Sequence, residues 1–488
     1  MIQKKLLASA VAVALTVGLT GCGGSSNSDN NKEEEVALTY NFQSRFINGA
    51  ESAQYPGQTT RHVLIADLNT TINGLKPENK TQQDIVDVLN SFYQEGTAAI
   101  GDNALLLTTD PATKQDTYNE ISTDKNLVGK TAGNDDVTDH KDWDGGDFVG
   151  WNTSTDPDSP NQLIQDWFNA IGANVESDFQ RSTPRTDPVA DGKDEELEVY
   201  HTDDGLDLKQ LVQKFLLGAV PFSQGTDDYL DDATANKGLL TDNTSAADNG
   251  AAAFTDLEHQ WDEGFGYFGA ARDYLAYTDE EIAGKGGRAA YENGYHDTDN
   301  DGAIDLVGEF NFGHSQNAAK RDLGSQSGTD FTKQAMEAFL AGRALISAAD
   351  GALSDAELEE LQGVRNQAVE AWENAIAATV VHYINDVLGD MDNADANDGS
   401  YSYIDHTKHW SELKGFALGL QFNPRSPLNA SSDNQSFDTL FAEFHGLVSE
   451  RPSLPGAQDF STYRDDLISA RTLMQNAYGF AEEDVLNW

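Results

Sequence analysis

Two segments place histidine and carboxylate side chains on one face of an expected helix. In the first segment, Asp262 and Glu263 follow His259 by three and four residues. In the second, Glu412 follows His409 by three, and both segments share a tryptophan and a following Gly-Phe pair. Residues three or four apart are neighbours on a helix, and helix bundles bind iron, manganese or zinc through such pairs. If the two helices meet, we expect a divalent-metal site (iron or zinc) with His259, Asp262, Glu263, His409 and Glu412 as candidate ligands.

The same residues have two other interpretations. Each histidine could be a buried or interfacial residue beside an ordinary ion pair, with Asp262 accepting a hydrogen bond from an imidazole. With a metal-bound water, Glu263 or Glu412 could act as general base of a metal-dependent peptidase. The sequence contains no His-Glu-x-x-His run and no Gly-x-Ser-x-Gly run, which are signatures of common hydrolases. We therefore expect metal binding without catalysis.

An acidic segment from Asp297 to Asp305 has the spacing of a calcium-binding loop. Carboxylates occupy its first, third, fifth and ninth positions, glycine the sixth and isoleucine the eighth, as in the first nine positions of an EF-hand loop. The usual glutamate of the twelfth position is displaced by one, because Gly308 precedes Glu309. The predicted calcium ligands are Asp297, Asp299, Asp301, Asp305 and Glu309, and the alternative is a solvated acidic turn.

The first residues predict export and lipid attachment. Lys4 and Lys5 precede an apolar stretch, Leu6 to Leu19, that is too short for a stable transmembrane helix. The sequence Leu-Thr-Gly-Cys then ends at Cys22, the only cysteine, which excludes an intramolecular disulfide. This pattern resembles a bacterial lipoprotein signal, which implies a signal peptide at 1–21 and lipidation of Cys22. It also implies a membrane partner through the lipid anchor and, with Gly23 following, sorting to the outer membrane, on its periplasmic face or at the cell surface.

The composition is strongly acidic, which limits the classes of binding partner that the protein can have. The 82 acidic residues exceed the 31 lysines and arginines, for a formal net charge of −51. Such a charge repels nucleic acid and favours cations, so no nucleic-acid partner is expected. Because the acids are scattered through the loops, adaptation to a saline environment outside the cytoplasm is the simplest explanation.

Helical periodicity dominates the elements that must position these side chains. About ten segments carry apolar residues at spacings of three and four, and few segments alternate as strands do. The helix that begins at Thr255 is expected to continue through Leu275, and the longest periodic run spans residues 356–388. We predict an all-α, multi-helix bundle with long irregular acidic insertions. It should form one domain over 39–488, built of halves 39–290 and 300–488, after a flexible tether at 22–38.

Several of these runs also carry a family resemblance. They are Asp207–Leu208, Lys214–Val220, His259–Gly269, Ile304–Leu306, Glu309–Asn311, Asn317–Asp322 and His409–Pro424. The chain from about residue 39 to its end resembles the bacterial lipoproteins described as domain of unknown function 4856, a likeness that implies little about activity.

A more distant similarity is to the imelysin-like proteins, which are helical, exported and linked to iron uptake. Their Gly-x-His-x-x-Glu signature is matched by His409 and Glu412, with Thr407 in place of the glycine. The resemblance implies a role in iron acquisition beside an outer-membrane transport protein. A calcium-stabilised structural or adhesive surface protein is the alternative.

Overall fold

The computed structural model describes residues 38–134, 140–143, 147–150, 159–189, 195–349, 351–429 and 440–488. These residues form sixteen α-helices and no sheet, and extended segments pair only in isolated bridges such as Gln43 with Glu51. The predicted all-α class is therefore confirmed. Ala37–Trp488 form one compact unit.

The predicted signal peptide, Cys22 and the tether as far as residue 37 lie outside the described residues. Within the described part of the chain, no helix combines the length and the apolar composition needed to cross a membrane.

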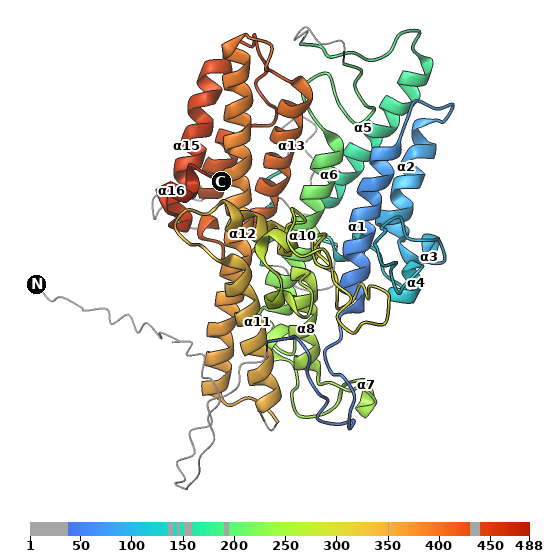
Figure 1. Cartoon of the computed structure of the whole chain (residues 1–488), viewed down its shortest axis with the longest axis vertical. Helices are drawn as coiled ribbons and strands as arrows, with labels where there is room; N and C mark the ends of the chain where they lie inside the picture. The colour runs from blue at the N-terminus through green and yellow to red at the C-terminus, as the bar shows by residue number, and fades with distance from the viewer. Residues whose placement is uncertain are drawn as a thin grey trace, which may run out of the picture. The chain divides into compact units, whose positions relative to one another are not determined.

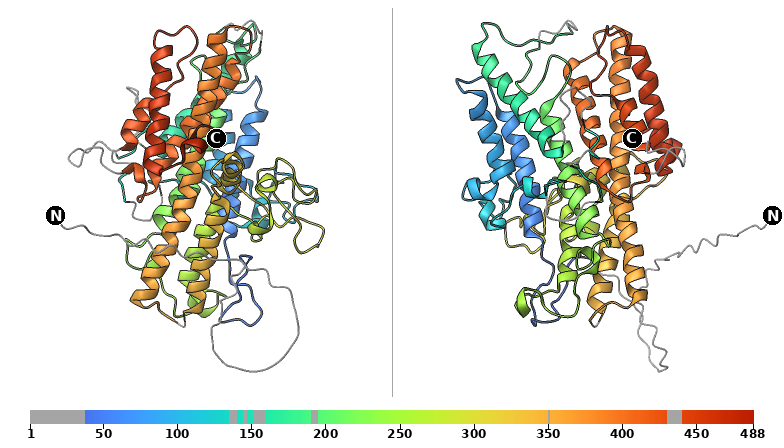
Figure 2. Two further views of the ribbon diagram at one scale, coloured as in Figure 1. Left: turned by 60° about the vertical axis from the view of Figure 1, so that its left-hand side comes forward. Right: turned by 180° about the vertical axis from the view of Figure 1, so that it is seen from behind.

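One long helix, α12 (Asp355–Ala396), organises the unit. Its 42 residues correspond to a length of about 60 Å, and it spans two tiers of shorter helices (Figure 1). The upper tier contains α15 (Phe460–Tyr478), α13 (Tyr403–Gly419), α6 (Leu208–Leu217), α1 (Pro56–Gly74), α5 (Pro160–Gln180) and α2 (Gln82–Asn90). In the lower tier, α11 (Phe331–Ala348) packs between α12 and α8 (Asp256–Phe268), as Figures 1 and 2 show.

Shorter elements connect the tiers. Helix α10 (Gly313–Gly324) contacts both α11 and α12, and α9 (Asp279–Ile282) packs beside it. The remaining helices are α3 (Thr97–Ile100), α4 (Tyr118–Ile121), α7 (Ala247–Gly250), α14 (Leu440–Val448) and α16 (Glu482–Val485).

Glycines bring α6 and α13 into backbone contact. A Cβ added to Gly218, just after α6, would lie 2.5 Å from the Cα of Gly419 at the end of α13. One turn earlier on α13, a Cβ on Gly415 would lie 2.6 Å from the Cβ of Lys214 on α6. Because only hydrogen fits at these positions, the two helices approach closely along their length and hold Lys214 close to α13.

Helix α8 begins where the sequence predicts and ends earlier. Thr255 and Glu258 form a capping box at its start, and the indole of Trp261 is buried and donates to the carbonyl of Phe339 at 2.9 Å. The expected continuation through Leu275 is wrong, because Gly269 adopts φ +85° and closes the helix with a left-handed cap.

Candidate metal centre

The acidic loop between α9 and α10 folds around the carboxylate of Asp297. The amide of Gly302 donates to Asp297 Oδ2 at 2.9 Å, and the amide of Asp301 donates to Oδ1 at 3.1 Å. Gly302 has φ +91°, a conformation that a side chain would disfavour. Ile304 is fully buried, and its amide donates to the carbonyl of Ala112 at 2.9 Å. The loop is thus anchored to an earlier segment of the chain through the isoleucine at its eighth position.

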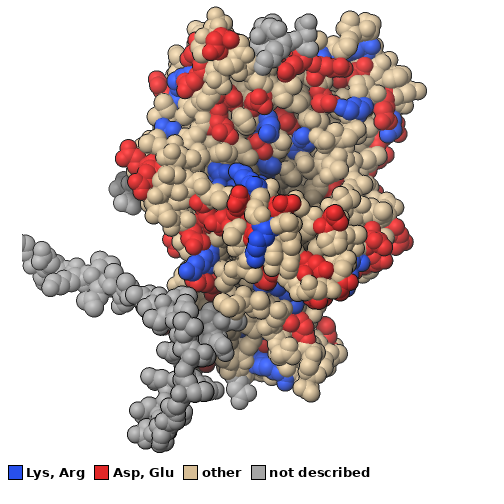
Figure 3. Space-filling view, in the orientation of Figure 1, with Lys and Arg blue, Asp and Glu red and all other residues tan. Residues whose placement is uncertain are grey.

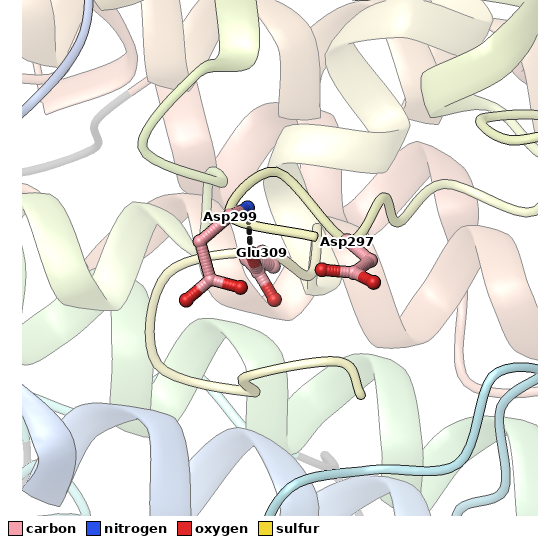
Figure 4. Close-up of side chains that lie close together, drawn as sticks. All are labelled: Asp297, Asp299 and Glu309. Carbon is pink, nitrogen blue, oxygen red and sulfur yellow. Dashed lines mark hydrogen bonds between the residues drawn. The ribbon is translucent and has the colours of Figure 1, made fainter. Parts of the chain in front are cut away.

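Three carboxylates of the loop converge (Figure 4). Oxygens of Asp297, Asp299 and Glu309 all lie within 4.8 Å of one another. One helical turn, closed by the Glu309 amide donating to the carbonyl of Asp305 at 2.8 Å, carries the displaced glutamate back over the loop. There, Glu309 Oε1 accepts the amide of Thr298 at 2.8 Å, and Oε2 accepts the amide of Asp305 at 2.8 Å. The one-residue displacement therefore leaves the glutamate on the site.

The other two predicted calcium ligands face different partners. Asp301 Oδ2 lies 3.2 Å from the ammonium of Lys114, and Asp305 Oδ1 accepts the Gln115 amide at 2.9 Å. The hydrogen bond from Lys114, together with a backbone hydrogen bond from Ala303, lowers the pKa of Asp301. The structure thus brings together Asp297, Asp299 and Glu309 and leaves Asp301 and Asp305 outside the triad.

The geometry of the triad suits a hard cation. Calcium–oxygen bonds are about 2.3–2.6 Å long, so two oxygens on opposite sides of the ion are about 4.8 Å apart, and the three carboxylate oxygens fall within that span. Glu309 is buried and Asp299 is exposed, so an ion bound there would have one side open to water. The arrangement can hold a metal ion through carboxylate oxygens alone.

In the first predicted His-Trp helix, α8, the polar side chains contact other residues of the protein and do not converge on a shared site. His259 Nε2 lies 3.6 Å from Glu263 Oε1, and its ring stacks on Phe254 with centroids 4.6 Å apart. Asp262 is completely buried and pairs with Arg343, with Oδ1 2.8 Å from the guanidinium Nε. Burial raises the pKa of Asp262, and Arg343 opposes that rise. Asp262 is therefore committed to a structural ion pair.

The second His-Trp helix, α13, finds its partners on other helices. His409 Nδ1 lies 2.8 Å from Asp390 Oδ2 of α12, and Glu412 Oε1 lies 3.5 Å from Lys214 Nζ of α6. Helices α8 and α13 lie in different tiers (Figure 2). Among the described residues, the only group of three converging His, Cys, Asp or Glu ligand atoms is the loop triad. The structure therefore does not bring the five predicted iron or zinc ligands together.

A cluster around His409 was missing from the sequence prediction. On α12, His382 Nε2 lies 3.3 Å from Asp386 Oδ2, and the same oxygen lies 4.0 Å from His409 Nε2. Burial, with Arg321 nearby, lowers the pKa of His382 to about 3. The i, i+4 spacing of His382 and Asp386 is visible in the sequence, but only the packing of α12 against α13 adds His409.

Comparisons with known proteins identify the family and no characterised relative. No curated protein and no solved structure shows significant similarity to the chain. A family model described as "Domain of unknown function (DUF4856)" matches residues 37–446, which include the acidic loop and both His-Trp helices. Because the match covers most of the chain, the protein belongs to the DUF4856 family.

Proposed function

We propose that this protein is an exported, lipid-anchored protein whose folded unit is stabilised by one calcium ion held at Asp297, Asp299 and Glu309. The observation that carries the proposal is the convergence of these three carboxylates within 4.8 Å. The lipoprotein-like sequence that ends at Cys22 supports the anchor and an outer-membrane location.

Calcium fits the ligands better than iron or zinc does. The triad offers only carboxylate oxygens, which suit calcium and magnesium, whereas zinc and iron sites usually include imidazole or thiolate. Calcium also tolerates irregular geometry, whereas magnesium requires a near-octahedral shell. A loop with a displaced glutamate and one open side therefore favours calcium.

The ion would act on the packing of the lower tier. The loop is joined to the segment around Ala112, and immediately after Glu309 the chain runs into α10 through Phe312, whose amide donates to the carbonyl of Gly269 at 2.7 Å. Three carboxylates held this close repel one another. A cation removes that repulsion and fixes the loop between α8 and α10, so calcium is expected to raise stability.

Thermal unfolding of the full chain with calcium or with chelator tests the proposal. The test variant is Glu309→Gln, and the matched control is Glu292→Gln, an exposed glutamate of the same segment. Calcium at one hundred times its dissociation constant should stabilise the wild type and the control by about 2.7 kcal/mol, and should barely affect Glu309→Gln.

Two further measurements determine which ion binds and at how many sites. Magnesium at the same concentration should give a smaller shift, and isothermal titration should show one calcium site in the wild type. If calcium shifts the unfolding midpoint of Glu309→Gln as much as that of the wild type, the assigned ligands are wrong.

A further inference from the structure

A cavity of about 280 Å³ lies where α1, α6, α10 and α13 meet. Its lining is of two kinds. Leu217, Phe312 and Phe416 contribute apolar surface, whereas Lys214, Lys320 and Asn317 contribute polar groups. The wall is thus mixed, with polar and apolar side chains in similar shares, and it provides both an apolar surface and the convergent polar groups that orient a small molecule. The cavity is separate from the acidic loop, since Asp297, Asp299 and Glu309 are not among its lining residues.

Lys320 has no carboxylate partner in this acidic protein. Among the described residues, its ammonium forms no hydrogen bond and no ion pair, although acidic residues outnumber basic ones 82 to 31. Burial lowers the pKa of Lys320 to about 8, and the nearby charges of Lys214, Arg321 and Lys285 act in the same direction, whereas Glu412 partly offsets them. The charge surrounding Lys320 is therefore predominantly positive.

The second lysine of the cavity is only partly neutralised. Lys214 Nζ lies 3.5 Å from Glu412 Oε1 and donates to Gln213 Oε1 at 2.7 Å. Glu412 does not line the cavity, and its single negative charge can neutralise only one of the two lysines, Lys214 and Lys320. One positive charge thus remains uncompensated at the cavity wall.

Basic side chains also gather on the surface at this place. Figure 3 shows lysine and arginine side chains near the middle of the face, where α10 lies in the same orientation of Figure 1. Arg321, the residue after Lys320, has a buried Nε that lacks a hydrogen-bond partner. The first turn of α10 lines the cavity through Gly313 and Gln316, and the N-terminal end of a helix favours negative charge.

We propose that this cavity binds a small organic carboxylate with an apolar body. Its carboxylate would accept hydrogen bonds from Lys320 and Lys214, and its body would pack against Phe312 and Phe416. Binding would give the partly buried ammonium of Lys320 the counter-charge that the protein does not supply. The apolar part of the wall distinguishes this ligand class from inorganic anions, which have no apolar surface to pack against Phe312 and Phe416.

Isothermal titration of the full chain with benzoate at low ionic strength tests the assignment, with neutral benzamide as the matched ligand. Lys320→Met removes the charge and keeps a long apolar side chain, and should weaken benzoate binding about tenfold or more, about 1.4 kcal/mol. The control is Lys333→Met on α11, where an exposed lysine lies 3.9 Å from Glu337; its affinity should equal that of the wild type. Benzamide should bind no variant measurably.

Thermal unfolding separates a binding defect from a folding defect. Benzoate should raise the unfolding midpoint of the wild type and of Lys333→Met, and at the same concentration should raise that of Lys320→Met much less. Without ligand, Lys320→Met should unfold at or above the wild-type temperature, because it removes a desolvated charge. Equal benzoate affinity in Lys320→Met and wild type, or no benzoate binding at millimolar concentration, would overturn the proposal. Phosphate binding as tightly as benzoate would overturn the apolar part of the assignment.

Discussion

Replacing Arg343 with methionine is expected to destabilise the protein by about 3–5 kcal/mol, the usual cost of leaving buried carboxylates unpaired. The Arg343 side chain is fully buried, as are its partners Glu258 and Asp262, at 3.0 Å and 2.8 Å. Tyr40 also donates to Asp262 at 2.8 Å. Removing the guanidinium leaves two buried carboxylates without their shared cation, although Arg45 still lies 3.3 Å from Glu258.

The magnitude should depend on which partner is removed. Asp262→Asn keeps the shape and leaves Arg343 paired with Glu258, so it loses one charge-assisted hydrogen bond worth about 1.5–3 kcal/mol. The double variant Arg343→Met/Asp262→Asn removes one charge of each sign, and Glu258 keeps Arg45 as its partner. Its loss should therefore be smaller than the sum of the two single losses by about 1 kcal/mol or more.

Urea unfolding at neutral pH, followed by circular dichroism with and without chelator, measures these losses. Lys333→Met is the control, because an exposed lysine near a glutamate contributes at most about 0.5 kcal/mol. The chelator should leave the difference between Asp262→Asn and wild type unchanged, since Asp262 pairs with arginine. A loss below about 1 kcal/mol for Arg343→Met, strict additivity, or a chelator-dependent effect of Asp262→Asn would refute the structural role.

Two further predictions concern packing and pH. Gly342→Ala should destabilise the protein by about 2–3 kcal/mol through overpacking, because its Cβ would lie 2.0 Å from the buried indole of Trp261. The control is Gly389→Ala, whose Cβ would meet nothing within 4 Å and which should stabilise the same fold. Equal urea midpoints for the two variants would contradict the packing. Burial lowers the pKa of His62 to about 4, against about 6.5 in an unfolded chain. Between pH 6.5 and pH 4 the unfolded state therefore binds more protons than the folded state, and the wild type loses stability as the pH falls through this range. His62→Gln still donates to the carbonyls of α8 and cannot titrate, so its stability relative to wild type should rise by up to about 3 kcal/mol over that range; a pH-independent difference in thermal unfolding would contradict this.

Local signals in the sequence predicted the helices and the acidic loop well. The apolar stripe of α8 and its capping residue Thr255 lie within one segment, and so do the alternating carboxylates after Asp297. The end of α8 was misplaced because the apolar residues beyond Gly269 continue the helical spacing, whereas the backbone of Gly269 turns left-handed. A glycine within an apolar pattern is ambiguous in sequence, and tertiary packing decides whether it ends the helix.

Partners from distant segments explain why two of the predicted calcium ligands lie outside the triad. Asp301 and Asp305 have the correct spacing, but Lys114 and Gln115 reach them from almost two hundred residues earlier. Nothing in the spacing of an acidic loop indicates that a lysine will pack beside one of its aspartates. Glu309 shows the opposite case, because a single helical turn compensates for its displaced position.

The surroundings of His409 could have been anticipated from the connection between its helix and the preceding one. Helix α12 ends at Ala396 and α13 begins at Tyr403, so the two form an antiparallel pair joined by a short link. In such a pair, residues equally far from the link face one another. Asp390 lies six residues before the end of α12 and His409 six after the start of α13, and they are bonded at 2.8 Å. Spacing along one helix suggested Glu412 as the partner of His409, whereas the helical hairpin assigns Asp390 to that role and leaves Glu412 to face Lys214.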